Sequence, residues 1–139
     1  MPVKDRALIE TSIVTAIAEA IPGCLAIYRF GSWGTEAERP DSDLDLAILP
    51  PAPLDNVARW ELAQRLASLA GRDVDLVDLL RASTVLKMQV VSQGTLLHDS
   101  GLSEVARFED YVFSSYARLN EERRDILLDI RERGSVYGK

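Results

Sequence analysis

The spacing of apolar and polar residues predicts helices and strands along the first third of the chain. Apolar residues three and four apart predict a helix over about Asp5 to Ala20. Leu25 to Phe30 is a short apolar run that predicts a buried strand. The polar residues 36–42 predict a loop, and Asp43 to Leu49 then alternates as expected for a second strand.

The middle of the chain continues this succession. The proline-rich residues 50–53 end the second strand, and Asn56 to Ala70 has helical periodicity. Alternation and β-branched residues predict a third strand over Asp73 to Leu80. Ser83 is a suitable N-cap for a helix that runs to about Gln93. Thr95 to His98 predicts a short fourth strand.

The last predicted element is a long helix over Glu104 to Arg131, with an apolar stripe and a charged outer face. The order of elements predicts an α/β (α+β) domain in which a small mixed sheet packs on helices. With 139 residues, the chain is long enough for one domain of ordinary size. We expect residues 1–139 to form it, with a core over about 1–100 and a C-terminal helix over 103–132.

Composition narrows the classes of function. The chain is 47% hydrophobic and carries a formal net charge of −6, which argues against a general coating of DNA or RNA. No apolar stretch approaches the ~20 residues that span a bilayer. The N-terminal sequence lacks an apolar signal core, and the one cysteine excludes an internal disulfide. We therefore expect a soluble cytoplasmic protein.

Two carboxylates at the start of the second strand are the first candidate site. Because side chains alternate across a strand, Asp43 and Asp45 point to one face, and Leu44 and Leu46 point to the other. Two like charges one pleat apart repel each other. A divalent cation removes this repulsion, and oxygen ligands suit Mg²⁺ or Mn²⁺.

A glycine and a serine directly after the first strand are the second candidate site. Gly31 allows the backbone to approach a ligand closely, and Ser32 offers a hydroxyl and a backbone N–H. A phosphate cradle beside a metal site predicts a nucleoside triphosphate as ligand. Trp33 is suited either to stacking on a base or to covering the sheet. Arg39 is suited either to a phosphate or to solvent.

The sequence from Gly31-Ser32 through ten further residues to Asp43-Leu44-Asp45 resembles the G-S-x10-D-x-D signature of the DNA polymerase β-like nucleotidyltransferase superfamily. More narrowly, residues Ile13 to His98 resemble the minimal nucleotidyltransferase (MNT) antitoxins that are paired with HEPN toxins. The resemblance implies the polymerase β-like palm fold. The spacing is more specific for the superfamily than for a substrate.

The resemblance also implies a third carboxylate on a later strand. Asp73 and Asp75 share one face of the third predicted strand, so periodicity alone does not choose between them. The resemblance favours Asp75. Two Mg²⁺ ions are then implied, one held by Asp43 and Asp45 and the other by all three aspartates.

For the MNT antitoxins, the resemblance implies that ATP is the donor and that AMP is transferred to a tyrosine of a HEPN ribonuclease toxin, which is thereby silenced. A hetero-oligomer with the toxin is implied as well. Two alternatives remain. One is an antitoxin that blocks the toxin by binding alone, and the other is a small-molecule transferase of the aminoglycoside-modifying type.

Overall fold

The computed structural model describes residues 6–31, 43–101 and 103–132. These residues form four helices and four strands. In chain order the elements are α1 (Arg6–Ala20), β1 (Ala26–Phe30), β2 (Leu44–Leu49), α2 (Asn56–Ala70), β3 (Val74–Asp78), α3 (Thr84–Gln93), β4 (Thr95–Asp99) and α4 (Glu104–Glu132). The predicted α/β (α+β) class and the order of its elements are confirmed.

The four strands form one mixed sheet in the order β3-β2-β1-β4. β1 pairs antiparallel with β2 and β4, whereas β2 and β3 run parallel. The end of β1 and the beginnings of β2, β3 and β4 therefore lie at the same end of the sheet. Segments that are far apart in the sequence meet at this end.

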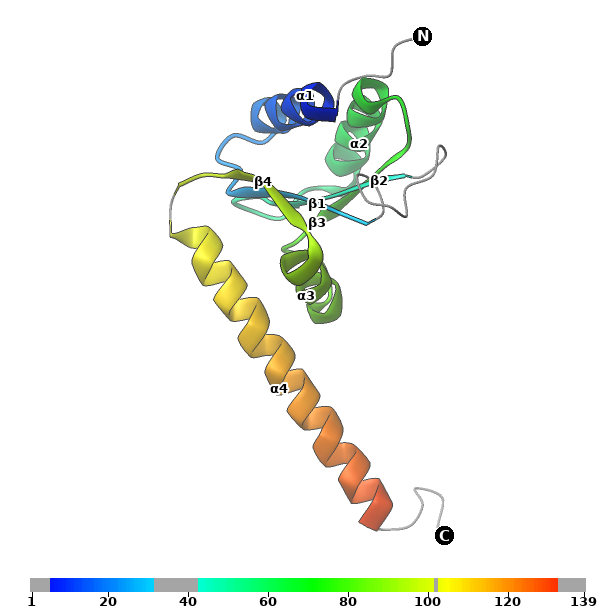
Figure 1. Ribbon diagram of the computed structural model, residues 1–139, viewed down its shortest axis with the longest axis vertical. Coiled ribbons are helices and arrows are strands. Elements are labelled where there is room, and N and C mark those ends of the chain that lie inside the picture. The colour runs from blue at the N-terminus through cyan, green and yellow to red at the C-terminus, as the bar shows by residue number, and fades with distance from the viewer. Residues whose placement is uncertain (1–5, 32–42, 102, 133–139) are drawn as a thin grey trace.

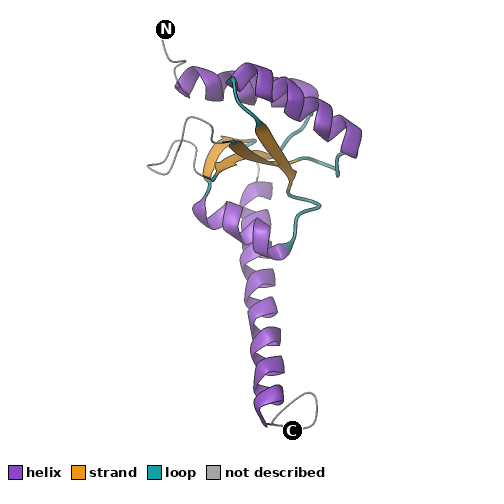
Figure 2. Cartoon of the chain, turned by 90° about the vertical axis from the view of Figure 1, so that its right-hand side faces the viewer, coloured by secondary structure: helices purple, strands orange, loops and turns teal. Residues whose placement is uncertain are grey.

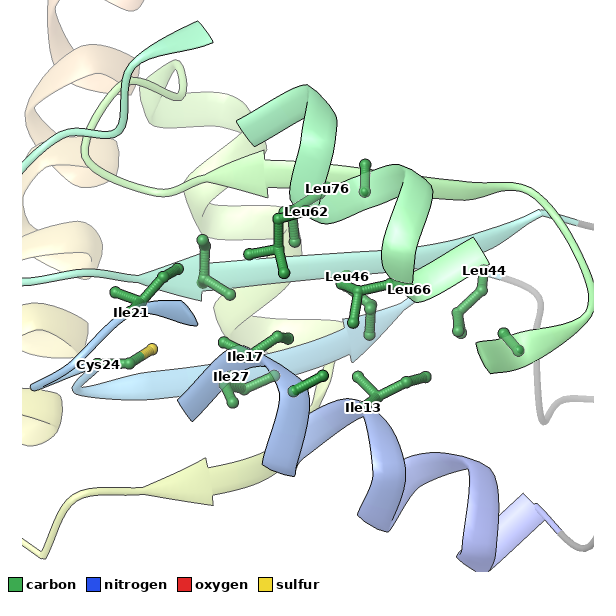
Figure 3. Packing of buried hydrophobic residues seen from close by; sticks show 14 of the residues in the cluster. Ile13, Ile17, Ile21, Cys24, Ile27, Leu44, Leu46, Leu62, Leu66 and Leu76 are labelled. Atoms are coloured by element: carbon green, nitrogen blue, oxygen red, sulfur yellow. The ribbon is translucent and has the colours of Figure 1, made fainter. Parts of the chain in front are cut away.

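One face of the sheet packs against α1 and α2 (Figures 1 and 2). Figure 3 shows Leu66 of α2 beside Leu46 of β2, and Ile17 of α1 beside Ile27 of β1. All four of these side chains are fully buried. Burial of each large aliphatic side chain contributes roughly 1.5–3 kcal/mol, so this layer is the main core that holds the strands in register.

The other face of the sheet packs against α3 and the first turns of α4 (Figure 1). Tyr28 of β1 is buried there, and its hydroxyl donates a 2.7 Å hydrogen bond to the carboxylate of Glu109 on α4. Desolvation of the phenol and the adjacent Glu109 carboxylate raise the pKa of Tyr28 well above its ordinary value. The bond fixes the base of α4 to the centre of the sheet.

Beyond its first turns, α4 extends far from the sheet (Figures 1 and 2). Only Val105 and Val112 are buried along its 29 residues. Ile126 and Leu127 near its end are exposed. No helix among the described residues is long and apolar enough to cross a membrane.

Two predicted strands were too long. β2 begins at Leu44, so Asp43 directly precedes it. β3 spans Val74–Asp78 rather than Asp73 to Leu80. The strand ends because the buried Asp78 carboxylate accepts a hydrogen bond from the backbone N–H of Leu80, which turns the chain away from the sheet.

Candidate active site

Gly31, at the end of β1, lies against the carboxylate of Asp45. Its φ of +78° is in the left-handed region that favours glycine. The preceding residue, Phe30, is opposite Asp45 in the register of β1 and β2. A Cβ atom at position 31 would lie only 2.1 Å from Asp45 Oδ2. The glycine therefore meets two requirements, a left-handed backbone and room for a carboxylate.

Asp45 and Asp75 are opposite each other on the parallel strands β2 and β3. Burial raises the pKa of Asp45, and the negative charges of Asp75 and then Asp43 raise it further. These three carboxylates are thus close enough to affect one another through charge. Asp43 and Asp75 are exposed, and Asp45 is partly exposed, so a ligand in solvent can reach all three.

The register distinguishes Asp75 from Asp73, which periodicity could not do. The backbone carbonyl of Asp73 accepts a hydrogen bond from the N–H of Leu44, which places Asp73 level with the entry to β2. Asp73 is not among the charges that raise the pKa of Asp45, whereas Asp75 is the stronger of the two that do. The structure therefore brings Asp75 to the predicted pair.

The aspartates lie on the face of the sheet that α3 covers. Leu44, Leu46 and Leu76 point into the core beneath α1 and α2. Alternation along each strand turns Asp45 and Asp75 the other way. α3 follows β3 and packs on this face farther along β2. Its Val90 belongs to the same buried cluster as Ala47 and Leu49.

The predicted phosphate cradle, Gly31 with Ser32, is described only in part. Gly31 is described, but Ser32, Trp33 and Arg39 lie outside the described residues. The structure therefore brings together Gly31 with the aspartates, and the prediction for Ser32 stays a prediction.

The donor set fits a divalent cation by chemistry and by charge. Three carboxylates, one of them with a pKa raised by burial and by the charges of the other two, present oxygen ligands and excess negative charge. Among residues 6–31, 43–101 and 103–132, no three acidic, histidine or cysteine side chains enclose a metal site by themselves. Mg²⁺ sites on phosphate substrates are commonly open in this way, with water and phosphate completing the coordination.

Sequence reasoning missed two arginines near the site. Arg59 of α2 and Arg81, which follows β3, line a pocket that Asp75 also lines. Neither is close to the aspartate motif in the sequence, and each resembles an ordinary surface arginine. The packing of α2 against β3 brings Arg59 to the third aspartate, and the turn after β3 places Arg81 beside it.

The comparisons with known proteins agree with this geometry. Residues 13–101 match the family described as polymerase beta, nucleotidyltransferase. The chain belongs to this nucleotidyltransferase family. The match includes Gly31 and all three aspartates, as well as the whole sheet.

Members of the family are also similar over nearly the full chain. The protein adenylyltransferase MntA of Shewanella oneidensis is 44% identical over 121 residues, which cover 87% of this chain and 86% of MntA. A chain of a toxin–antitoxin crystal structure with AMP-PNP has a TM-score of 0.78 and 43% identity, covering 88% of this chain and 98% of that one. A chain in the complex of tri-AMPylated S. oneidensis HEPN toxin with MNT antitoxin has a TM-score of 0.77 and 42% identity, covering 91% and 99%. The similarity therefore extends over more of the chain than residues 13–101, which match the family model.

Proposed function

We propose that this nucleotidyltransferase is an antitoxin that transfers AMP from ATP to a tyrosine of a cognate HEPN ribonuclease toxin, and that the transfer silences the toxin. The observation that carries the proposal is the contact of Gly31 with Asp45, next to Asp75. That arrangement suits a triphosphate held at one end of a row of carboxylates. The relatives that bind AMP-PNP or are found with an AMPylated HEPN toxin support the choice of donor and acceptor.

The chain's own residues would take distinct parts in the reaction. The backbone of Gly31, with Ser32, would hold the β- and γ-phosphates. Asp43 and Asp45 would hold one Mg²⁺ ion, and these two with Asp75 would hold a second. Bound there, the two ions would neutralise the triphosphate and stabilise the entering and leaving oxygens. Mn²⁺ has the same ligand preference.

The covalent change is a substitution at the α-phosphorus of ATP. The tyrosine hydroxyl oxygen forms a bond to that phosphorus, and the bond to the bridging oxygen of the β-phosphate breaks. Pyrophosphate leaves, and the hydroxyl proton passes to the Asp75 carboxylate or to water. Most of the rate enhancement would come from positioning and from neutralised charge.

The complex of the relative holds a toxin with three AMP groups. We extend this to the present chain and propose that it adds several AMP groups in succession. The residues matched to the family, 13–101, lie within the proposed catalytic core of a single domain, and α4 would complete the domain. Because ATP and Mg²⁺ are abundant in the cytoplasm, we propose that the protein acts there, in a hetero-oligomer with its toxin.

The proposal is tested by incubating the protein with its toxin, Mg²⁺ and ATP, and measuring the intact mass of the toxin. We expect a gain of whole AMP units and a matching loss of ribonuclease activity. The double variant Asp43→Asn, Asp45→Asn should add none, while Asp73→Asn, at the same end of the sheet, should add AMP at a rate within a few-fold of wild type. Inhibition of the toxin without ATP and without a mass gain would instead identify an antitoxin that blocks by binding. Transfer to an aminoglycoside but not to the toxin would identify a small-molecule transferase.

A further inference from the structure

A pocket of about 270 Å³ lies along the outer edge of β3, beside the proposed third carboxylate. Asp75 lines it from the strand. Asn56 and Arg59 line it from α2, and Arg81 lines it from the turn after β3. Two guanidinium groups and an amide are thus gathered next to a proposed reaction centre in a chain with a net charge of −6.

Local hydrogen bonds position both arginines. Arg59 Nη1 donates to the backbone carbonyl of Leu76 at 3.0 Å, across the edge of the sheet. Arg81 Nε donates to the carbonyl of Leu54 at 3.1 Å. Each guanidinium carries five N–H donors, so these bonds fix the side chain and use a single nitrogen of it. Donors therefore remain for a ligand.

The charges around the pocket favour an anion once a cation is bound. Arg81 Nε is 3.9 Å from the Asp78 carboxylate, which partly offsets its charge. Asp78 is 4% exposed, and it also accepts a hydrogen bond from the backbone N–H of Leu54. Asp75 would be neutralised by Mg²⁺ under the proposed function. The two arginines then leave a positive pocket, and their planar forks match the oxygens of a phosphate.

The order of strands assigns the pocket to one side of the reaction. Gly31 on β1, Asp45 on β2 and Asp75 on β3 follow one another across the sheet, and the pocket lies past β3, the outermost strand. Under the proposed function the triphosphate of ATP lies at Gly31. The pocket therefore lies on the opposite, acceptor side of the carboxylates.

We propose that this pocket binds the phosphate of an AMP group that is already attached to the acceptor while the next AMP group is added. The inference rests on the proposed function and names Arg59 and Arg81 as specificity residues for the later additions. In each later step a ribose hydroxyl of the attached AMP bonds to the α-phosphorus of a new ATP. Pyrophosphate leaves, and the hydroxyl proton passes to Asp75 or to water.

The test compares the first and later additions in single variants. The toxin is incubated with ATP and Mg²⁺, and the AMP groups per toxin are followed by intact mass spectrometry over time. For Arg81→Gln and Arg59→Gln we expect the first addition within about twofold of wild type. The second should be slower by about tenfold or more, because each variant loses a charge-assisted hydrogen bond to the phosphate. The loss should appear as a raised KM for toxin that carries one AMP, and not for unmodified toxin.

Arg65→Gln is the matched control. Arg65 is on the same helix as Arg59, but its partner is Glu19 at 3.4 Å and both side chains are largely exposed. It should give the wild-type ladder of AMP additions. Arg81→Lys keeps the charge but not the fork, and it should recover part of the second addition. Thermal denaturation of each variant checks that the fold is intact.

The outcomes separate this inference from the proposed function. If the wild-type protein transfers no AMP, both are wrong. If it adds only one AMP, or if each further AMP is on a different toxin residue, the pocket inference is wrong and the proposed function stands. The same holds if the arginine variants keep the later additions, or if they slow the first addition as much as the second. A selective loss of later additions supports the pocket.

Discussion

Replacing Gly31 with alanine tests the geometry of the site most directly. The substitution has two separable effects. An alanine at φ +78° is strained by roughly 1–2 kcal/mol, because its Cβ approaches the following carbonyl oxygen. The new Cβ would also lie 2.1 Å from Asp45 Oδ2 and 3.0 Å from Asp45 Cγ. Ordinary contact distances are well over 3 Å, so the carboxylate has to move by about 1 Å or more.

The expected results for stability and for activity therefore differ. The free energy of unfolding should fall by only about 1–2 kcal/mol, since the Asp45 carboxylate is partly exposed and can turn into solvent. The rate of AMP transfer should fall by about 100-fold or more, because a shift of about 1 Å in a positioning group has that effect. Urea denaturation measures the first quantity, and transfer of AMP from labelled ATP to the toxin measures the second.

Gly71 provides the control for backbone strain. It ends α2 with a φ of +73°, and a Cβ there would meet nothing within 4 Å. Gly71→Ala should therefore lose a similar amount of stability and keep its transfer rate within about twofold. If Gly31→Ala transfers AMP at the wild-type rate, the contact between Gly31 and Asp45 has no part in the reaction. An equal loss of activity in Gly71→Ala would attribute the effect to strain.

Three further predictions concern aspartates. Because the folded-state pKa of Asp45 is raised above its ordinary 3.8, the metal-free protein should lose stability as the pH rises from about 4 through that raised pKa. Solvent screening keeps this below about 1 kcal/mol, and Asp45→Asn should remove it; equal pH slopes in thermal denaturation would contradict the cause given. Asp75→Asn should lower AMP transfer by about 100-fold or more, while Asp73→Asn should stay within a few-fold, and the reverse result would exchange their roles. Asp78→Ala should lower the free energy of unfolding by about 2–4 kcal/mol, because two backbone N–H groups lose a charged acceptor; an unchanged urea midpoint would refute this.

The sequence by itself determined the elements and half of the candidate site. Helices and strands are predicted from the spacing of apolar residues, and that spacing is a local property of the sequence. Alternation along one strand is also local, so it was enough to place Asp43 and Asp45 on one face. Periodicity does not determine the limits of β2 and β3, because hydrogen bonds beyond the repeating pattern set them. The buried Asp78 carboxylate, which ends β3 through Leu80, is one example.

Only the tertiary structure decided which distant residues join that pair. The choice of Asp75 over Asp73 depends on the parallel register of β2 and β3, because a shift of two residues would have placed Asp73 opposite Asp45 instead. The contact of Gly31 with Asp45 depends on the antiparallel pairing of β1 and β2. Arg59 reaches Asp75 only because α2 packs over the edge of β3. These are pairings between strands and helices whose free energy depends on the whole core, and periodicity along one segment does not contain them.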